Sequence, residues 1–553
     1  MNSFISLLKV KLTTCMLLII CSVFSQTVTP WLTTGDKTKL IAQQNTVSFA
    51  ASSGSANATI SINTGLKYQT MDGFGFAFTE GSAEVISTLS AMQQDALLTE
   101  LFNKTTGIGV SVIRISIGAS DLSSSDYFYN STPGDVNMTN FSLAGPDLTY
   151  LIPLLKKMLI INPDIKILAS PWSPPLWMKS NNGVYGGSLL TKYYTAYANY
   201  FVRYFHEMKL QGINIWGITV QNEPGNGTND PSMLMTSAEQ KNFINNYLGS
   251  AMALAGFGSI KIIAYDHNCD NTAFPIDVCN NSAYVDGAAF HLYAGNISAM
   301  TTVKNATNKN IYFTEQYTGA GGDFSGGFSW HMQNVIIGAA TNWAKAIIEW
   351  NLASNPTQDP HTVGGCSTCL GAITVDNALG YTRNVSYYIV GQISKFVKDG
   401  AVRIDATTSD ATIGSVGFKN SDGSNAVLIY NSNNSSKTVK VLYSSKSFNY
   451  TIPAASAVTF VWKDVTTLNE ELNVKKTLLY PNSSGAVLTI KNFDNVSFTY
   501  ISILTMKGES VLQQKLEPSN HASTVNISTL PKGIYIAKLG GKNDVICQRF
   551  IKQ

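Results

Sequence analysis

Two glutamates end apolar stretches of the sequence in a way that could support acid–base chemistry. Glu223 closes the run IWGITVQNEP at 215–224, and Glu315 closes the run IYFTEQ at 311–316. Runs of β-branched and aromatic residues predict buried strands, so each strand would deliver a carboxyl group at its C-terminal tip. Glycoside hydrolysis requires such a pair, because one carboxyl protonates the leaving oxygen while the other meets the charge that develops on the sugar. For either glutamate alone, the alternative is an ordinary salt bridge at a strand end.

The composition is typical of an extracellular, β-rich protein of several domains. Of the 553 residues only 13% are charged, whereas 10% are aromatic and Gly, Asn, Ser and Thr are abundant. The formal charge of +3 is spread along the chain without a block of Lys and Arg. We therefore expect neither nucleic acid nor a membrane surface as a partner.

Residues 1–25 predict a secretory signal peptide. Lys9 and Lys11 precede an apolar run at 15–24 that is too short to span a bilayer. Lipidation of Cys21 is an alternative that the bulky Ile20 before it disfavours. No other apolar run approaches the length of a membrane-spanning helix, so the protein is expected to be secreted or attached to the cell surface.

Strands and helical patterns alternate through the middle of the chain. Amphipathic helical patterns, such as 191–209 and 237–255, separate many of the strands. Eight strands separated by helices fit an α/β fold, the (β/α)8 barrel. A doubly wound open sheet is the alternative, which the lack of a glycine-rich turn after the first strand disfavours. The predicted strands are 71–76, 110–116, 165–170, 215–221, 260–265, 287–291, 311–314 and 346–349.

In a barrel the C-terminal ends of all strands meet at one mouth, so residues that follow different strands become neighbours. The residues at these ends combine carboxyl groups, aromatic faces for the C–H surfaces of sugars, and partners for hydroxyl groups. This mixture predicts a carbohydrate site. Besides Glu223 and Glu315, the residues are Arg114, Asp121, Trp172, Asn222, Asp266, His267, His291, Tyr293, Trp350 and Asn351.

Six ordered motifs resemble glycoside hydrolase family 30, a retaining family that includes glucosylceramidases and β-1,6-glucanases. The resemblance covers about residues 47–463 and implies a (β/α)8 barrel with a side β-sandwich, which is built from an early segment and the sequence after the barrel. The motifs are GFGFAFTEGSA (73–83), ASPWSPPLWMKSN (169–181), ITVQNEP (218–224), AFHLY (289–293), YFTEQYTGA (312–320) and EWNL (349–352).

The resemblance also implies roles for the residues at the strand ends. Glu223 matches the acid/base of the family and Glu315 its nucleophile, with no metal or organic cofactor. We expect Glu223 to be kept protonated by a less polar setting and by its charged neighbour, about 5 Å away. For Arg114, pairing with a structural carboxylate is the alternative. The sugar-binding positions of the family match Arg114, Asp121, Trp172, Asn222, Tyr293 and Trp350, with His291 nearby.

Two loops depart from the glucosylceramidase pattern, namely 364–371 (GGCSTCLG) and the stretch 222–235 that contains Glu223. Because these loops should form the leaving-group side, the departure favours a polysaccharide substrate such as β-1,6-glucan. Hydrolysis of glucosylceramide in glycolipid is one alternative. A non-catalytic glycan-binding protein is another, which the presence of both carboxyls and Asn222 disfavours.

Five cysteines remain after removal of the signal peptide. Cys366 and Cys369 form a C-x2-C motif, Cys269 and Cys279 lie ten residues apart, and Cys547 is left over. A zinc site would need two further ligands beside the motif. An oxidising compartment favours disulfides or plain thiols in loops.

The end of the chain changes to short alternating strands, which predict all-β domains. The last segment resembles the C-terminal sorting domain of type IX secretion, although Ser483 stands where a proline is usual, so secretion machinery is an expected partner. A carbohydrate-binding module is the alternative, disfavoured by the lack of Trp. The predicted organisation is a signal peptide (1–25), a segment contributing to the β-sandwich (26–68), the barrel (69–398), the β-sandwich (399–463), a linker (464–474) and the sorting domain (475–553).

Overall fold

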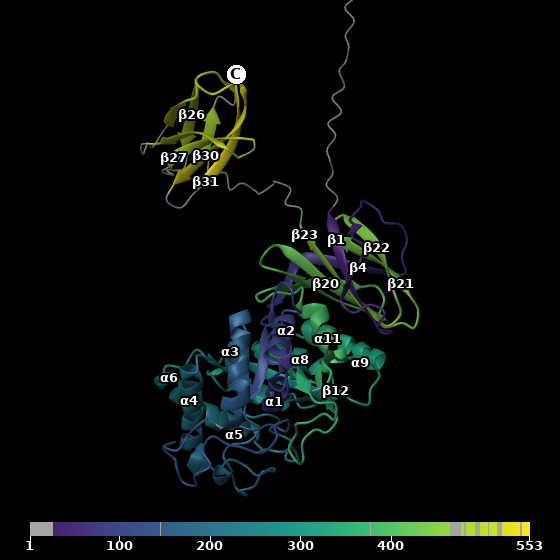
Figure 1. The fold of residues 1–553 in the computed structure, drawn as a ribbon, viewed down its shortest axis with the longest axis vertical. Helices are drawn as coiled ribbons and strands as arrows, with labels where there is room; N and C mark the ends of the chain where they lie inside the picture. Colours follow the sequence, from purple (N-terminus) through teal and green to yellow (C-terminus); the bar gives the residue numbers. More distant parts are fainter. Residues whose placement is uncertain are drawn as a thin grey trace, which may run out of the picture. The chain divides into compact units, whose positions relative to one another are not determined.

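The computed structural model describes residues 26–143, 145–376, 378–464, 477–480, 483–492, 498–506, 508–516, 522–541 and 545–553. The chain divides into two compact units, Met1–Asp464 and Val465–Gln553 (Figure 1). The predicted signal peptide, and the predicted linker after Asp464, lie outside the described residues. None of the described helices is both long enough and apolar enough to cross a membrane.

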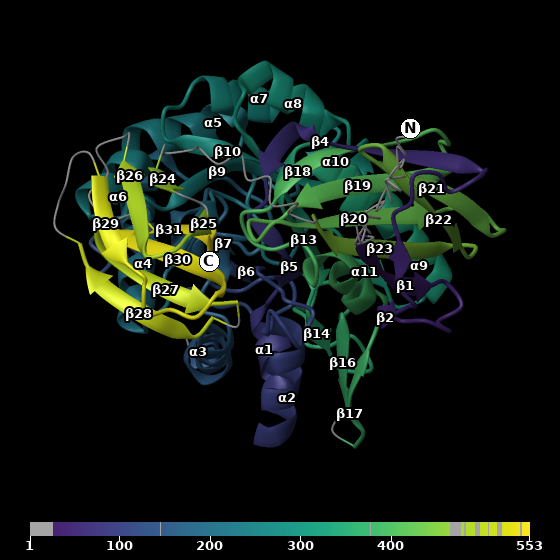
Figure 2. The same ribbon diagram turned by 90° about the horizontal axis from the view of Figure 1, so that it is seen from above.

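Eight parallel strands close into a barrel in chain order, which confirms the predicted (β/α)8 fold. The predicted fourth strand, 215–221, is shorter in the structure, and the sixth, 287–291, is longer. The helices lie outside the strands, as α3, α7 and α8 show in Figure 2. The barrel strands are β5 (Gly73–Ala77), β6 (Val112–Ser116), β7 (Lys166–Ser170), β8 (Gly217–Thr219), β9 (Lys261–Cys269), β10 (Val285–Gly295), β11 (Asn310–Glu315) and β13 (Ala344–Asn351).

The strands are continuous apolar runs because both of their faces are buried. Phe74 and Ile113 belong to the large core that extends under the helices. Val112, Leu168 and Ile348 belong to a separate cluster, to which six of the barrel strands contribute. The barrel is therefore packed with side chains, and the site rests on a solid base.

The helices follow the predicted periodicity. Helix α4 carries the predicted pattern 191–209, and 237–255 contains α5 and α6 with a π-helical turn at 244–248 between them. The helices are α1 (Glu80–Ser87), α2 (Ala91–Phe102), α3 (Ile152–Ile161), α4 (Tyr194–Leu210), α5 (Ser237–Phe243), α6 (Gly249–Leu254), α7 (Ala273–Asn280), α8 (Ala299–Thr307), α9 (Phe324–His331), α10 (Gly338–Thr341) and α11 (Val385–Ser394).

The early segment and the sequence after the barrel share one sheet. Strand β1 pairs with β23, and β4 lies between β18 and β21. Ile60 of β4 shares one core with Val427 and Phe460, which lie on the paired strands β20 and β23 further along the sheet, so the sheet folds over this core as a sandwich. Its strands are β1 (Thr27–Thr34), β2 (Ala42–Gln43), β3 (Val47–Ser48), β4 (Ala58–Thr70), β18 (Val402–Thr408), β19 (Ile413–Lys419), β20 (Ser424–Asn431), β21 (Lys437–Tyr443), β22 (Lys446–Ile452) and β23 (Ser456–Lys463).

The second unit is the small all-β module that the sequence predicts. Two sheets share a core that includes Leu488, Ile501 and Val525. The strands are β24 (Thr477–Tyr480), β25 (Ser483–Ser484), β26 (Val487–Asn492), β27 (Phe498–Thr505), β28 (Ser510–Lys515), β29 (Ala522–Asn526), β30 (Gly533–Gly541) and β31 (Val545–Lys552).

Gln392 of α11 joins the barrel to the sandwich. Its side-chain amide is buried and donates to the carbonyl of Trp31 (2.8 Å) and to Thr459 (3.0 Å). Its Oε1 accepts from the hydroxyl of Thr33 (2.6 Å). One side chain therefore satisfies polar groups of both β1 and β23.

We expect Gln392→Leu to lower the free energy of unfolding by about 2 kcal/mol, because it removes three buried hydrogen bonds, to Thr33, Trp31 and Thr459. Urea unfolding of the purified protein measures the change. Gln333→Ala is the matched control, since Gln333 is exposed and bonds only within its own helical segment. Equal stability of the two variants would contradict a joining role for Gln392.

Candidate active site

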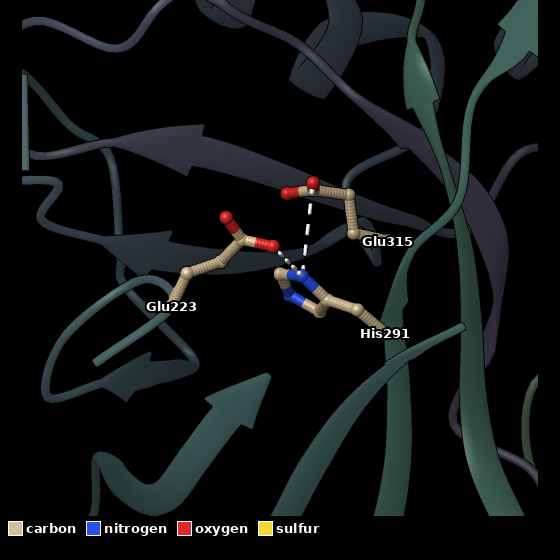
Figure 3. Close-up of side chains that lie close together, drawn as sticks. All are labelled: Glu223, His291 and Glu315. Carbon is tan, nitrogen blue, oxygen red and sulfur yellow. Dashed lines mark hydrogen bonds and ion pairs between the residues drawn. The ribbon is translucent and has the colours of Figure 1, made fainter. Parts of the chain in front are cut away.

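The two glutamates singled out in the sequence face each other at the barrel mouth. Glu223 follows β8, the fourth barrel strand, and Glu315 ends β11, the seventh. One oxygen of each lies within 4.8 Å of the other and of a His291 nitrogen (Figure 3). This separation agrees with the short distance expected from the sequence.

The backbone at Glu223 is held in an uncommon conformation. Glu223 has φ 45°, and Tyr265 and Asp266 also lie in the left-handed region, with φ 73° and 65°. The amide of Glu223 donates to the carbonyl of Asp266 (2.9 Å), and the Asn226 amide donates to Glu223 Oε2 (2.8 Å). Such conformations cost about 1 kcal/mol or more each and persist where surrounding contacts enforce them, as at functional sites.

Arg114 of β6 forms the base of the site. Its guanidinium is fully buried and donates to Glu315 Oε2 (2.6 Å), Asp266 Oδ2 (2.8 Å) and Asn222 Oδ1 (2.7 Å). The contact with Asn222 Oδ1 turns the amide NH2 of Asn222 away from the arginine. Arg114 therefore pairs with carboxylates, which is the alternative considered for it, and one of these carboxylates is Glu315. Its contact with a sugar stays a prediction.

His291 of β10 links three carboxylates. Its Nδ1 lies 3.1 Å from Glu223 Oε1 and 3.7 Å from Glu315 Oε1, and its Nε2 lies 3.1 Å from Asp266 Oδ1. Burial would lower the pKa of His291, but Glu315, Asp266 and Glu223 outweigh this effect and raise it to about 10. The imidazole is therefore protonated at neutral pH.

From the sequence, Glu223 is expected to carry the proton of the site, and the structure differs from this expectation. Burial alone would raise the pKa of Glu223, but the imidazoles of His267 and His291 hold it well below its ordinary value. For Glu315, burial outweighs His291 and Arg114 and raises the pKa. The expectation fails because the groups nearest to the carboxyl of Glu223 are the imidazoles of His267 and His291 rather than another carboxylate. At neutral pH the shared proton lies on His291.

Glu223, His291 and Glu315 are also the one group among the described residues with the donor atoms and spacing for a metal ion. The 3.1 Å contact between His291 and Glu223 is a direct hydrogen bond, which occupies the donor atoms that an ion would need.

A cavity of about 450 Å³ opens above these residues. Tyr293 donates its hydroxyl to Glu315 Oε1 (3.0 Å), and Trp350 stacks on Trp172 at 5.5 Å. The described residues offer no hydrogen-bond partner to buried Asp121 Oδ1 or Trp172 Nε1. Asp121 lines the cavity, where a hydroxyl group of a sugar would supply the missing partner. The cavity is lined by Asp121, Glu223, Gly225, Asn226, Asn229, His267, Asn268, Tyr293, Glu315, Tyr317, Trp350, Cys366 and Cys369.

The structure thus brings the residues that match the family's catalytic and sugar-binding positions together, in two layers. Asn351 lies apart from them and bonds Ser82 and the carbonyl of Cys369. Asp121, Tyr293 and Trp350 line the cavity with the two glutamates. The layer beneath consists of Arg114, Trp172, Asn222 and His291, which contact one another or the glutamates.

Asp266 is more central than the sequence indicates. Besides Arg114 and His291, it accepts hydrogen bonds from Thr219 (2.6 Å) and Thr314 (2.7 Å). Its position at a strand end is visible in the sequence, and the short polar residues inside two apolar strands were the signal for its partners. Its role depends on the left-handed backbone conformation of residues 265 and 266 inside β9, which no sequence pattern reveals.

Cys366 and Cys369 form a disulfide that lines the cavity, so they are not zinc ligands. Short strands hold this wall in place: β12 (Thr318–Gly319), directly after Glu315, pairs with β15 (Cys369–Leu370). Beyond it lie β14 (Ala353–Ser354), β16 (Ile373–Asp376) and β17 (Gly380–Arg383). Cys269 and Cys279 are buried free thiols, and Cys547 is free and exposed.

We expect Arg114→Lys to lower kcat/KM by about 100-fold and stability by about 2 kcal/mol, because a lysine cannot make the three contacts of the guanidinium fork. Kinetics on an aryl β-glucoside and urea unfolding measure the two effects. Arg383→Lys is the matched control, since Arg383 also binds a carboxylate, Glu100, through two nitrogens but lies away from the site. Similar losses of activity in both variants would contradict the central role of Arg114.

Comparison with known protein families agrees with this geometry. Residues 71–397 match the glycosyl hydrolase family 30 TIM-barrel domain, and residues 400–460 match its β-sandwich domain. Residues 478–553 match a secretion system C-terminal sorting domain. This match confirms the expected sorting domain, and with it a secreted or cell-surface location.

Individual relatives cover most of the first unit. The endo-1,6-β-D-glucanase neg1 of Aspergillus fumigatus is 35% identical over 424 residues, which are 71% of this chain and 85% of that protein. The lysosomal acid glucosylceramidase of Mus musculus is 28% identical over 72% of this chain and 82% of its own length. A solved endo-β1,6-glucanase structure is 36% identical with a TM-score of 0.74, covering 79% of this chain and 99% of the other. The chain belongs to glycoside hydrolase family 30.

Proposed function

We propose that the protein hydrolyses β-1,6-glucan with retention of the β configuration, using Glu315 as nucleophile and Glu223 as acid/base. The observation that carries the mechanism is the separation of the two carboxyls, with oxygens within 4.8 Å of each other. Retaining glycosidases hold their carboxyls about 5 Å apart, whereas inverting enzymes leave several Å more for a water molecule.

In the first step Glu315 forms a bond to the anomeric carbon while the bond to the leaving oxygen breaks. Arg114 and Tyr293 each donate to a different oxygen of Glu315 and so fix the direction of attack. Glu223 gives the leaving oxygen a proton and takes one from His291 through their hydrogen bond.

The two events are coupled through charge. The carboxylate of Glu315 is the leading electrostatic cause of the raised pKa of His291. As Glu315 becomes an ester it loses this negative charge, so His291 releases its proton more readily. The proton therefore moves towards the leaving group as the covalent bond forms.

In the second step the carboxylate of Glu223 takes a proton from water, and the water oxygen attacks the anomeric carbon. Glu315 leaves as a carboxylate, and Glu223 passes the proton that it took from water to His291, so all three groups return to their starting charges. Two displacements at one carbon return the β configuration. Arg114 holds the Oδ1 of Asn222, and we assign the NH2 of Asn222 to donate to the 2-hydroxyl in both steps.

Two observations support β-1,6-glucan as the substrate. The relatives named endo-1,6-β-glucanase reach 35–36% identity, above the lysosomal glucosylceramidase at 28%. On the Glu223 side, the cavity is lined by Asn226, Asn229, Asn268 and His267. Amide and imidazole groups suit the hydroxyls of a sugar chain better than the acyl chains of a glycolipid.

A substrate screen tests this proposal. The purified protein is incubated with β-1,6-glucan, β-1,3-glucan, xylan and glucosylceramide, and NMR follows the first anomer released. We expect turnover of β-1,6-glucan with the β-anomer appearing first. Release of the α-anomer would reject the mechanism, and preference for glucosylceramide would reject the substrate.

The two glutamates should differ in one kinetic respect. We expect Glu315→Gln to reduce turnover of every substrate by at least about 10⁴-fold. Glu223→Gln should spare the first step for an aryl glycoside with a good leaving group, because that group departs without a proton. Pre-steady-state release of the phenol measures this step, with Glu84→Gln as control, because Glu84 is a half-buried glutamate of α1 whose carboxylate accepts from Ser124 and not from a residue of the site. Equal loss in both variants would reject the assignment.

The dependence of kcat/KM on pH should show the titration of Asp121. Burial, followed by Glu315 and Glu223, raises the pKa of Asp121 to about 8, so its proton is present below pH 8 and lost above it. Deprotonation replaces a hydrogen-bond donor by a further anion, so we expect kcat/KM to fall above about pH 8. In Asp121→Asn, which keeps a neutral donor, this limb should move towards pH 10, where His291 titrates. A limb that stays near pH 8 in the variant would contradict this.

A further inference from the structure

Tyr185 presents an exposed aromatic ring at the rim of the barrel mouth. It lies in the loop between β7 and α4, and its side chain is 47% exposed. Its hydroxyl donates to Asp230 Oδ2 (3.0 Å). Asp230 is itself 3% exposed, so the tip of the tyrosine is fixed while its ring remains open to solvent.

The position of Asp230 places this ring on the leaving-group side. Asp230 belongs to the loop that follows Glu223, next to Asn229, which lines the cavity. Asp230 Oδ2 also accepts from the amide of Gly364 (2.8 Å), and its carbonyl accepts from Thr362 (2.7 Å). Three loops therefore meet at Asp230: the one with Tyr185, the one with Glu223 and the one with the disulfide.

A buried lysine keeps the tyrosine loop rigid. Lys179 is 2% exposed, and its ammonium donates to the carbonyls of Gly183 (2.6 Å), Val184 (2.9 Å) and Ser232 (2.6 Å). These contacts tie the residues just before Tyr185 to the loop that follows Glu223. The ring is thus held in place before any substrate arrives, which reduces the entropy lost on binding.

We propose that Tyr185 is the stacking platform of a distal subsite that binds a sugar unit of the leaving chain. This rests on the proposed function, because only a sugar polymer places a further sugar unit beyond Glu223, on the leaving-group side. The hydrogen bond to Asp230 requires only the hydroxyl group of Tyr185, so it does not explain why an aromatic ring is exposed there. The large ring offers an apolar face to the C–H surface of a glucose unit, as the amphipathic nature of tyrosine permits.

The test compares Tyr185→Ala, Tyr185→Phe and Tyr284→Ala on a β-1,6-linked glucohexaose and on an aryl β-glucoside. Tyr284 is a matched control, because it is 43% exposed and precedes β10 at the opposite end of the barrel. The readout is selectivity, defined as kcat/KM on the hexaose divided by kcat/KM on the aryl glucoside.

We expect selectivity to fall about tenfold in Tyr185→Ala, mainly through a higher KM for the hexaose. Tyr185→Phe keeps the ring and should stay within about threefold of the parent. The proposal is overturned if the selectivity of Tyr185→Ala equals that of Tyr284→Ala, or if the selectivity of Tyr185→Phe falls as far as that of Tyr185→Ala. A parent enzyme that cleaves the aryl glucoside but not the hexaose would instead reject the proposed substrate.

Discussion

The structure depends on balancing buried charge at the barrel mouth. Glu223, Asp266 and Glu315 bring three carboxylates into a region where an isolated charge is very costly. Arg114 and the protonated His291 supply the two compensating positive charges. One negative charge remains, and this residual charge makes the site attractive to the positive centre that forms during glycoside cleavage.

The rest of the fold serves this balance. The barrel strands bring the charged groups to one mouth from five different strands or strand ends, so their positions are set by the hydrogen bonds between strands rather than by flexible loops. The apolar cluster of Val112, Leu168 and Ile348 closes the barrel below them. The longer loops above the strands determine specificity. The disulfide of Cys366 and Cys369 and the carboxylate of Asp230 fix the positions of these loops.

Much of this could be predicted from the sequence, because barrel strands are continuous apolar runs and their ends converge. That rule was sufficient to bring Arg114, Glu223 and Glu315 together. The location of the proton was not predictable, since it depends on the few ångströms between Glu223 and two imidazoles. The disulfide also required coordinates, because spacing alone does not show that Cys366 and Cys369 are bonded while Cys269 and Cys279 stay free. Nor could the sequence show that Tyr185 and Gly364, 179 positions apart, share the carboxylate of Asp230.

The pairing of β4 with β18 has a consequence for the order of folding. Ile62 lies opposite Ala406, so this ladder joins residues on either side of the entire barrel sequence. During synthesis β4 remains without these partners until the barrel sequence and the strands after it have been made. Contacts over such a separation close slowly, and an unpaired strand is prone to aggregation. The sandwich therefore cannot be completed until the whole barrel sequence has been made.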